Sequence, residues 1–424
     1  MTAHHTGKPP RTLRVPQAAA RRQARLLVVL AGLSAASPLA TDMYVPGLPD
    51  LARSLGTDAS GAQMSLTGFL AGIIVGQLVL GPISDVVGRR PVLVVGTGLF
   101  AVFSAVCALA PDLAVLNAAR LGQGITGAAG IVVARAVVSD LFVGDGELAT
   151  VFSRLGAITA TAPVLAPLAG GALLLVVSWR YVFAFLAVVG LLLTLGVLRW
   201  VPESHPPQAR LTGGLAGGLR AIGRVAARRA VLAPVLALAF GGAAVFAYIA
   251  GTTFVFQDIY HLDPALSSLV YGVNAVGNMA GSLAYGWLAR RWSAETLLVA
   301  SGVLALAGPA ALLLVQVTVG SGLPVTWLCL LFALTAFGVF FPAVVTIAQS
   351  RGRAAPGATS ALLGGGQFLL GAGVSPLVGL FGTRSPAPMA AIMASCLALA
   401  TLAAAATRLS YSSCDASHRR PHAG

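Results

Sequence analysis

The chain has 424 residues, of which 57% are hydrophobic and only 9% charged, and its mean hydropathy is +0.86. A soluble protein of this length needs far more polar surface, so the composition excludes a soluble fold and predicts a protein embedded in lipid. A net charge of +14 could suggest a nucleic-acid partner, but the basic residues stand in short clusters at the ends of apolar runs and form no continuous basic face, which argues against nucleic-acid binding.

Apolar segments of about 20 residues, the length that crosses a bilayer, run along the whole chain. Twelve such segments begin near residues 26, 60, 92, 114, 148, 181, 231, 265, 296, 326, 358 and 387. The longest polar interruption, residues 200–230, contains three prolines and separates two sets of six segments. We therefore predict an all-α membrane protein with a basic tail at 1–25, a first six-helix half at 26–199, a linker at 200–230, a second six-helix half at 231–406 and a tail at 407–424.

The basic residues are unequally shared between the two sides of the predicted bundle. Most of the 27 lysine and arginine residues lie in the tails and in the loops on the side of the N-terminus. Cytoplasmic loops carry such an excess. We therefore predict a multi-pass protein of the plasma membrane with both termini and the linker in the cytoplasm.

Asp42 is the one acidic residue that the predicted segments place deep inside the bilayer. It lies about 24 Å along the first segment, and Arg120 lies about 9 Å from the opposite face along the fourth, so the two share a similar depth. A carboxylate close to a fixed arginine can ionise there and release the arginine when it takes up a proton, so the pair is interpreted as a site of proton coupling. The alternatives are a static ion pair, or an Asp42 that caps the first external loop.

A short polar break, Gly81–Pro91, joins the second and third apolar segments. Its glycines, acid and arginines are Gly81, Gly88, Asp85, Arg89 and Arg90. Arginines alone would explain a turn that only fixes topology, which is the alternative. An acid among them indicates a latch that pairs in one conformation and separates in another.

Several segments together resemble the motifs of one transporter family, the major facilitator superfamily. Gly81–Pro91 resembles its loop between helices 2 and 3, Leu116–Gly124 its helix 4 motif with Arg120, and Ala162–Gly171 the helix 5 motif of its antiporters. The segments Thr41–Pro49, Phe254–Gln257 and Ala358–Leu363 are similar to the Bcr/CflA subgroup of drug:proton antiporters with twelve spans.

The resemblance implies the fold and the mechanism of that family. Two six-helix halves would rock around a central cavity and export small toxic molecules, such as chloramphenicol or bicyclomycin, against proton entry. It further implies that Asp85 faces the start of helix 11 near Gly357 and Ala358, and that Arg89 pairs with Asp140. The antiporter motif would place Pro163, Pro167, Gly170 and Gly171 against the other half, in a role against leaks or in plain packing.

Aromatic and amide side chains on the helices that line the pathway in this family are the candidates for the substrate cavity. They suit apolar, partly aromatic substrates with a few polar atoms, and ordinary helix packing is the alternative for each. These candidates are Tyr44, Asn117, Tyr248, Phe254, Phe256, Tyr271, Asn274, Asn278, Gln367 and Phe368.

The sequence indicates neither an enzyme nor a cofactor protein. It has no phosphate-binding loop, and its six histidines are too scattered to form a metal site. We expect the partners to be a small-molecule substrate, protons and the lipid bilayer, with no nucleotide and no nucleic acid, and we expect a monomer. The alternatives to drug export are proton-coupled transport of a metabolite such as a sugar or an amino acid, and a non-transporting membrane sensor or scaffold.

Overall fold

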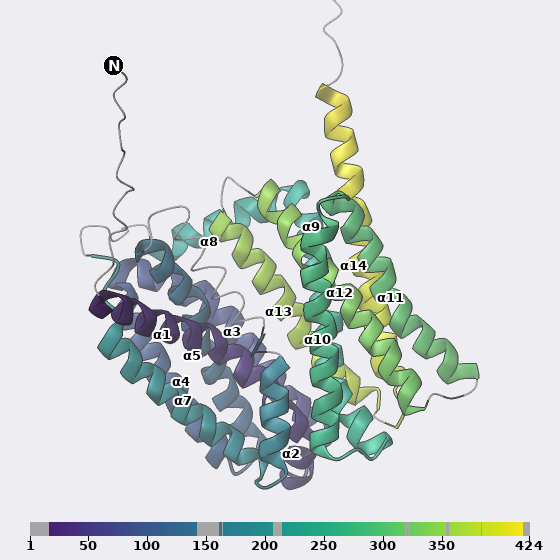
Figure 1. The fold of residues 1–424 in the computed structure, drawn as a ribbon, viewed down its shortest axis with the longest axis horizontal. Coiled ribbons are helices and arrows are strands. Elements are labelled where there is room, and N and C mark those ends of the chain that lie inside the picture. Colours follow the sequence, from purple (N-terminus) through teal and green to yellow (C-terminus); the bar gives the residue numbers. More distant parts are fainter. Residues whose placement is uncertain are drawn as a thin grey trace, which may run out of the picture.

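The computed structural model describes residues 17–141, 161–162, 164–206, 214–318, 320, 322–352, 356–382 and 384–418, and the secondary structure of these residues is helical (Figure 1). The first elements are α1 (Gln17–Asp42), η1 (Val45–Gly47), α2 (Leu48–Ser54), α3 (Ala59–Val87), α4 (Arg89–Leu109), α5 (Leu113–Leu141), a helix at Val164–Leu174 and α7 (Trp179–Trp200). They are followed by α8 (Gly214–Ala226), α9 (Arg229–Phe254), the π-helical turn η3 (Val255–Ile259), α10 (Pro264–Leu288), α11 (Ala294–Thr318), α12 (Leu323–Arg351), α13 (Pro356–Leu380) and α14 (Ala387–His418).

Ten helices in the described part of the chain are long and apolar enough to cross a membrane. An eleventh predicted span is present as α10, whose 25 residues have the required length, although its asparagines and serines lower the hydropathy. The fifth predicted span is described only at Val164–Leu174, because residues 142–160 and 163 lie outside the described residues. Large apolar side chains such as Leu283 and Val317, which are 72% and 83% exposed, cover the outside of the bundle as lipid contact requires.

Local sequence signals set the ends of several helices. Asp58 precedes α3 and its carboxylate accepts a hydrogen bond from the Gly61 amide at 2.7 Å, and Asp263 precedes α10 with Pro264 at its first position. Both are N-cap arrangements that satisfy free amides of a first turn. Gly88 separates α3 from α4 with φ of 114°, a backbone conformation that favours glycine.

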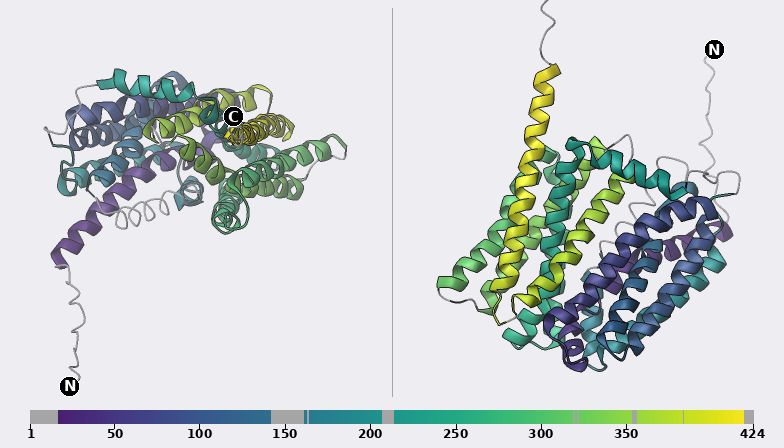
Figure 2. Two further views of the ribbon diagram at one scale, coloured as in Figure 1. Left: turned by 90° about the horizontal axis from the view of Figure 1, so that it is seen from above. Right: turned by 180° about the vertical axis from the view of Figure 1, so that it is seen from behind.

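The helices pack as two groups (Figures 1 and 2). The first group holds α1, α3, α4, α5 and α7, and the second holds α9 to α14. Glycines allow matching close contacts in both: a Cβ added to Gly72 of α3 would lie 3.0 Å from the Cα of Gly124 of α5, and one added to Gly281 of α10 would lie 3.1 Å from the Cα of Gly338 of α12. The second and fourth long helices of each group therefore approach in the same way, as small residues permit where lipid gives no hydrophobic drive.

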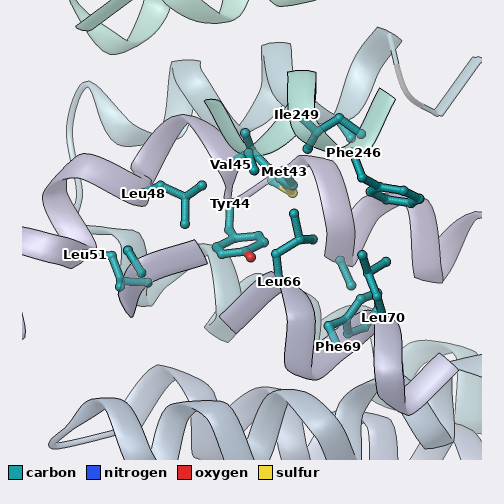
Figure 3. Packing of buried hydrophobic residues seen from close by; sticks show 14 of the residues in the cluster. Met43, Tyr44, Val45, Leu48, Leu51, Leu66, Phe69, Leu70, Phe246 and Ile249 are labelled. Carbon is teal, nitrogen blue, oxygen red and sulfur yellow. The ribbon is translucent and has the colours of Figure 1, made fainter. Parts of the chain in front are cut away.

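The two ends of the bundle differ in how the groups meet. We call the end that carries α2 the α2 end, and the end that carries Gly88 and α8 the linker end. One buried cluster joins residues of both groups toward the α2 end, including Leu48, Phe69 and Phe246 (Figure 3). Toward the linker end the groups have separate clusters, one around Leu93 and one around Val344. The hydrophobic core therefore closes the α2 end in this conformation.

The region predicted as a linker contains a helix that the sequence reading did not anticipate. In α8, Val225 is buried while Arg220 and Arg224 are exposed, and the helix contacts both α3 and α13. The predicted tails are also partly helical, because α1 begins at Gln17 and α14 ends at His418.

Candidate functional site

Asp42 lies at the end of α1, between the two groups of helices. Its side chain is buried, with only 5% of the residue exposed. The hydroxyl of Tyr271, on α10 of the second group, faces its carboxylate. The capping positions of η1 and α2 are Tyr44 and Gly47, without side-chain bonds, so Asp42 is not the cap that one alternative expected. It is a cross-group contact instead.

Arg120 is fully buried in α5 and is held by polar groups of its own helix group. Its Nε donates to the Ser65 carbonyl at 3.2 Å, and its Nη1 donates to the Ala40 carbonyl at 3.1 Å and to the Gln123 side-chain oxygen at 2.7 Å. The Gln123 amide in turn donates to the Ser104 hydroxyl at 2.7 Å. This network fixes the guanidinium beside the last turn of α1.

Aromatic rings surround the same guanidinium. The Arg120 Cζ lies 4.2 Å from the ring centre of Phe69, 4.4 Å from that of Tyr44 and 5.5 Å from that of Phe183. Desolvated cation–π contacts of this kind are worth about 2 kcal/mol. The two N–H groups of Nη2 remain, because Arg120 Nη2 is buried and has no hydrogen-bond partner.

The expected ion pair between Asp42 and Arg120 does not form in this conformation. The ion pairs among the described residues involve Arg53, Arg89 and Arg351. The guanidinium instead bonds to the carbonyl of Ala40, two residues before Asp42. Arg120 therefore lies beside the last turn of α1, but the Asp42 carboxyl at the end of that turn faces Tyr271 of α10 rather than Arg120 of α5.

Three predicted cavity residues gather beside Asp42 on the second group. Tyr248 and Tyr271 stack with ring centres 5.4 Å apart, and the Asn274 amide donates to the Tyr248 hydroxyl at 3.0 Å. Trp327, which the sequence reading did not select, donates from its indole to the Asn274 oxygen at 3.1 Å. Its position close to the start of an apolar run is typical of an interfacial anchor, so no sequence signal distinguished it.

The other predicted cavity residues are dispersed. Asn278 donates to the Leu334 carbonyl at 3.1 Å, and Phe254 and Phe256 are buried in the shared core. The remaining ones have these surroundings: Tyr44 shares a 3.2 Å hydrogen bond with Ser65, Asn117 has a buried oxygen without a partner, Gln367 packs against Gly242, and Phe368 lies 5.8 Å from Phe246 between ring centres. A hollow of about 440 Å³ at the α2 end, lined among others by Asp58 and Arg384, includes none of them.

The segment Gly81–Pro91 forms a compact charge cluster around Arg89 at the linker end. Arg89 pairs with Asp85 at 2.5 Å and with Asp140 of α5 at 3.2 Å, so the expected contact with Asp140 is present. It also donates to the Ser84 hydroxyl at 2.6 Å. At Gly81 an added Cβ would lie 3.3 Å from Val132 of α5, which places this glycine at a close helix contact.

Glu203 completes the cluster and was not selected from the sequence. Its carboxylate accepts from the backbone amides of Arg89 and Arg90 at 2.9 and 3.3 Å, and Arg90 reaches the Leu198 carbonyl at 2.6 Å. An acid at a helix start is favoured by the helix dipole. Its only sequence signal was an isolated acid within a basic linker. The implied contact of Asp85 with the start of α13, near Gly357 and Ala358, stays a prediction.

The helix Val164–Leu174 connects the groups at the α2 end. A Cβ on Gly170 would collide with the backbone of Met43, and one on Gly171 would collide with Ser268 of α10. Pro167 is buried, and Pro163 lies outside the described residues. The expected placement of this segment against the other half is therefore present at Gly171.

Comparison with known proteins gives one consistent family. The model of the Major Facilitator Superfamily matches residues 30–376. The uncharacterized MFS-type transporter YdgK of Bacillus subtilis is 37% identical over 370 residues, which cover 87% of this chain and 91% of that protein. The bicyclomycin resistance protein homolog of Haemophilus influenzae is 27% identical over 387 residues, which cover 89% and 94%.

Solved structures show the same fold at low identity. The nucleoside transporter NupG, in a mutant form, has a TM-score of 0.71 at 13% identity and covers 91% of this chain and 99% of its own. A bacterial homolog of the human lysosomal transporter Spinster, inward-facing and unoccupied, has a TM-score of 0.68 at 16% identity and covers 92% and 96%.

Proposed function

We infer that this chain, which belongs to the major facilitator superfamily and is a multi-pass membrane transporter rather than an enzyme, exports small drug-like molecules in exchange for protons. Resemblance to a bicyclomycin resistance protein homolog supports the substrate class. The observation that carries the proton coupling is Asp42, a buried carboxyl that faces the Tyr271 hydroxyl of the other helix group. Ionisable residues within spanning segments characteristically mark proton pathways.

The proposed coupling uses two alternative partners of Asp42. In the present conformation the Tyr271 hydroxyl of the second group faces the carboxyl. Arg120 belongs to the same group as Asp42, and its Nη2 nitrogen is buried without a hydrogen-bond partner. When the groups tilt apart at the α2 end, Asp42 leaves Tyr271, and its ionised form gains a cation in Arg120. Proton release from Asp42 would thus favour the conformation that is open at the α2 end, and proton uptake would favour the conformation that is closed there.

In this proposal the two groups correspond to the predicted halves 26–199 and 231–406, which tilt relative to each other around Asp42. The charge cluster of Arg89, Asp85 and Asp140 lies within the first group and is the proposed latch at the linker end, with its pairs formed in the conformation that is closed at the α2 end. The basic linker end faces the cytoplasm of a plasma-membrane monomer, as the arginine distribution supports. Tyr248, Asn274 and Trp327 offer aromatic faces with few polar atoms, which suits a neutral or weakly charged drug.

A susceptibility profile tests the function. Cells with the chain should tolerate one or more neutral antibiotics of the chloramphenicol or bicyclomycin type better than cells without it, and a proton uncoupler should remove the difference. Protection that survives the uncoupler would contradict proton coupling. Flux of sugars or amino acids only, in reconstituted vesicles, would establish the metabolite alternative, and no flux of any substrate would establish a scaffold.

Asp85→Asn should lower export several-fold while membrane insertion stays normal, because Arg89 loses the charge at 2.5 Å that helps hold the latch. Export and protein level are measured in the same cells. Asp112→Asn is the matched control, because Asp112 caps α5 by accepting from Val115 at 2.9 Å and asparagine caps equally well. Equal losses of protein and export in Asp85→Asn would show that the segment only fixes topology.

Tyr271→Phe should reduce uphill export and leave protein levels unchanged, because the stacked ring remains while the hydroxyl facing Asp42 is lost. The initial rate of drug efflux against a gradient is the measurement. Tyr285→Phe is the matched control, since its hydroxyl donates at 3.2 Å to Thr346, away from Asp42. Full export by Tyr271→Phe would exclude the hydroxyl from coupling.

A further inference from the structure

Three polar side chains on one face of α3 bind the main chain of α13 across the boundary between the groups. Ser60 donates to the Pro376 carbonyl at 3.1 Å, and Thr67 donates to the Ala372 carbonyl at 2.8 Å. Gln63, between them, accepts from the Gly379 amide at 2.9 Å. Spacings of three and four residues put all three on the same helix face. We call Ser60, Gln63 and Thr67 the α3 polar stripe.

Gln63 reaches a second helix of the other group as well. Its side-chain nitrogen donates to the Ala250 carbonyl of α9 at 3.0 Å. The residue is fully buried, and its neighbours Ala62 and Leu66 belong to the shared hydrophobic cluster. One amide thus joins α3 to α9 and α13, with both its oxygen and its nitrogen bonded. An amide in such surroundings is costly when its bonds are unmade.

The sequence of α13 explains why its backbone accepts these bonds. Pro376 lies inside α13 and has no N–H, so the carbonyl of Ala372, four residues earlier, lacks its helical donor. The Thr67 hydroxyl supplies that donor. Gly379 permits the close approach, because a Cβ there would collide with the backbone of Ser60. Pro376 and Gly379 therefore give α13 a free carbonyl and the close approach that the α3 polar stripe needs.

These bonds lie where the groups are closed. Ser60 lies in the first turn of α3, at the α2 end. This is the end at which one buried hydrophobic cluster contains residues of both groups. Figure 2 shows α3 and α13 side by side, in agreement with their packing. A movement that opens the α2 end has to separate Gln63 from both Ala250 and Gly379, whereas a movement at the linker end does not.

We propose that Gln63 is the gate residue of the α2 end: its two hydrogen bonds to the other group hold this end closed and break when it opens. Ser60 and Thr67 add to the same contact. The inference rests on the proposed alternating access for its role in transport, but the gate itself needs no substrate and no proton gradient. It follows that the closed state depends on a neutral amide, whose bonds do not change with the charge of Asp42.

The test is a distance measurement between spin labels across the α2 end. Leu109→Cys and Val317→Cys place labels on the first and second groups, at residues 80% and 83% exposed, in a chain whose four native cysteines are replaced. In lipid nanodiscs, Gln63→Leu should raise the ratio of molecules with the long label distance to molecules with the short one. The expected rise is roughly five- to thirty-fold, which corresponds to about 1–2 kcal/mol. Thr67→Val should shift it in the same direction by less.

Gln77→Leu is the matched control, because Gln77 lies on the same helix, next to Gly364 toward the linker end, and its loss should leave the distances at the α2 end unchanged. An unchanged distribution in both Gln63→Leu and Thr67→Val, with normal elution as a monomer, would overturn the proposal, as would an equal shift in Gln77→Leu. If Gln63→Leu does not fold, Thr67→Val and Ser60→Ala decide alone. If the parent chain exports no drug but Gln63→Leu still shifts the distance distribution, the proposed function is refuted and the gate proposal still holds.

Discussion

Asp42→Asn is expected to abolish export against a gradient and to leave exchange of drug down its gradient intact. Asparagine keeps the size of the side chain and a polar group for the Tyr271 hydroxyl, but it carries no exchangeable carboxyl proton. Without that proton the two conformations lose their link to the proton gradient, whereas the tilting itself does not require it. Resistance should fall to the level of cells that lack the protein.

Uphill efflux and counterflow exchange in reconstituted vesicles measure the two parts separately. Asp42→Glu, which restores the carboxyl, should recover part of the uphill rate. Asp50→Asn is the control for loss of an acid, because Asp50 lies on α2 at the same end in an exposed contact with Arg53 at 4.0 Å. Loss of counterflow together with uphill export in Asp42→Asn would show a binding or folding defect, and undiminished uphill export would remove Asp42 from the coupling.

Arg120→Lys is expected to destabilise the protein by about 2–4 kcal/mol and to stop transport, because lysine cannot reproduce the spread of donors. Three acceptors, on Ser65, Ala40 and Gln123, lose a fixed partner in a fully buried site. The three aromatic rings also lose the flat cation that lies among them. The loss should therefore appear in stability as well as in activity.

Unfolding of the purified protein in a fixed detergent measures the stability change. Arg180→Lys serves as the comparison, because Arg180 makes one hydrogen bond to the Ala110 carbonyl at 2.9 Å at the edge of the bundle and should cost far less. If Arg120→Lys were as stable as the parent and lost only uphill export, Arg120 would act in coupling alone. If it were stable and fully active, the buried network would have neither role.

Helix positions were predictable because every helix that crosses the lipid bilayer needs a run of about 20 apolar residues. The apolar runs that begin near residues 60 and 92 became α3 and α4, and Gly88 ended the first of them as its backbone freedom allows. The contact between Arg89 and Asp140 was also expected, because the resemblance named both residues. These features depend on composition, spacing or a recognisable motif.

Contacts that depend on how helices are rotated were not predictable. Asp42 and Arg120 were expected to pair because they share a depth, but depth does not determine the direction in which a side chain points. Gln63 drew no attention as a single amide in an apolar run, and its importance appears only where α3 meets the broken hydrogen-bond ladder of α13. The helix α8 was missed because glycine and proline near it indicated a linker.

The central claim is that drug movement and proton movement are one cycle that passes through Asp42. Purified protein in sealed vesicles with a pH-sensitive dye inside tests it most directly: an imposed drug gradient, without a pH gradient, should drive protons in the opposite direction. The account predicts this counter-movement in the parent chain and its absence in Asp42→Asn, although drug still equilibrates in both. Proton movement of equal size in Asp42→Asn, or drug flux in the parent with no proton movement, would contradict the account.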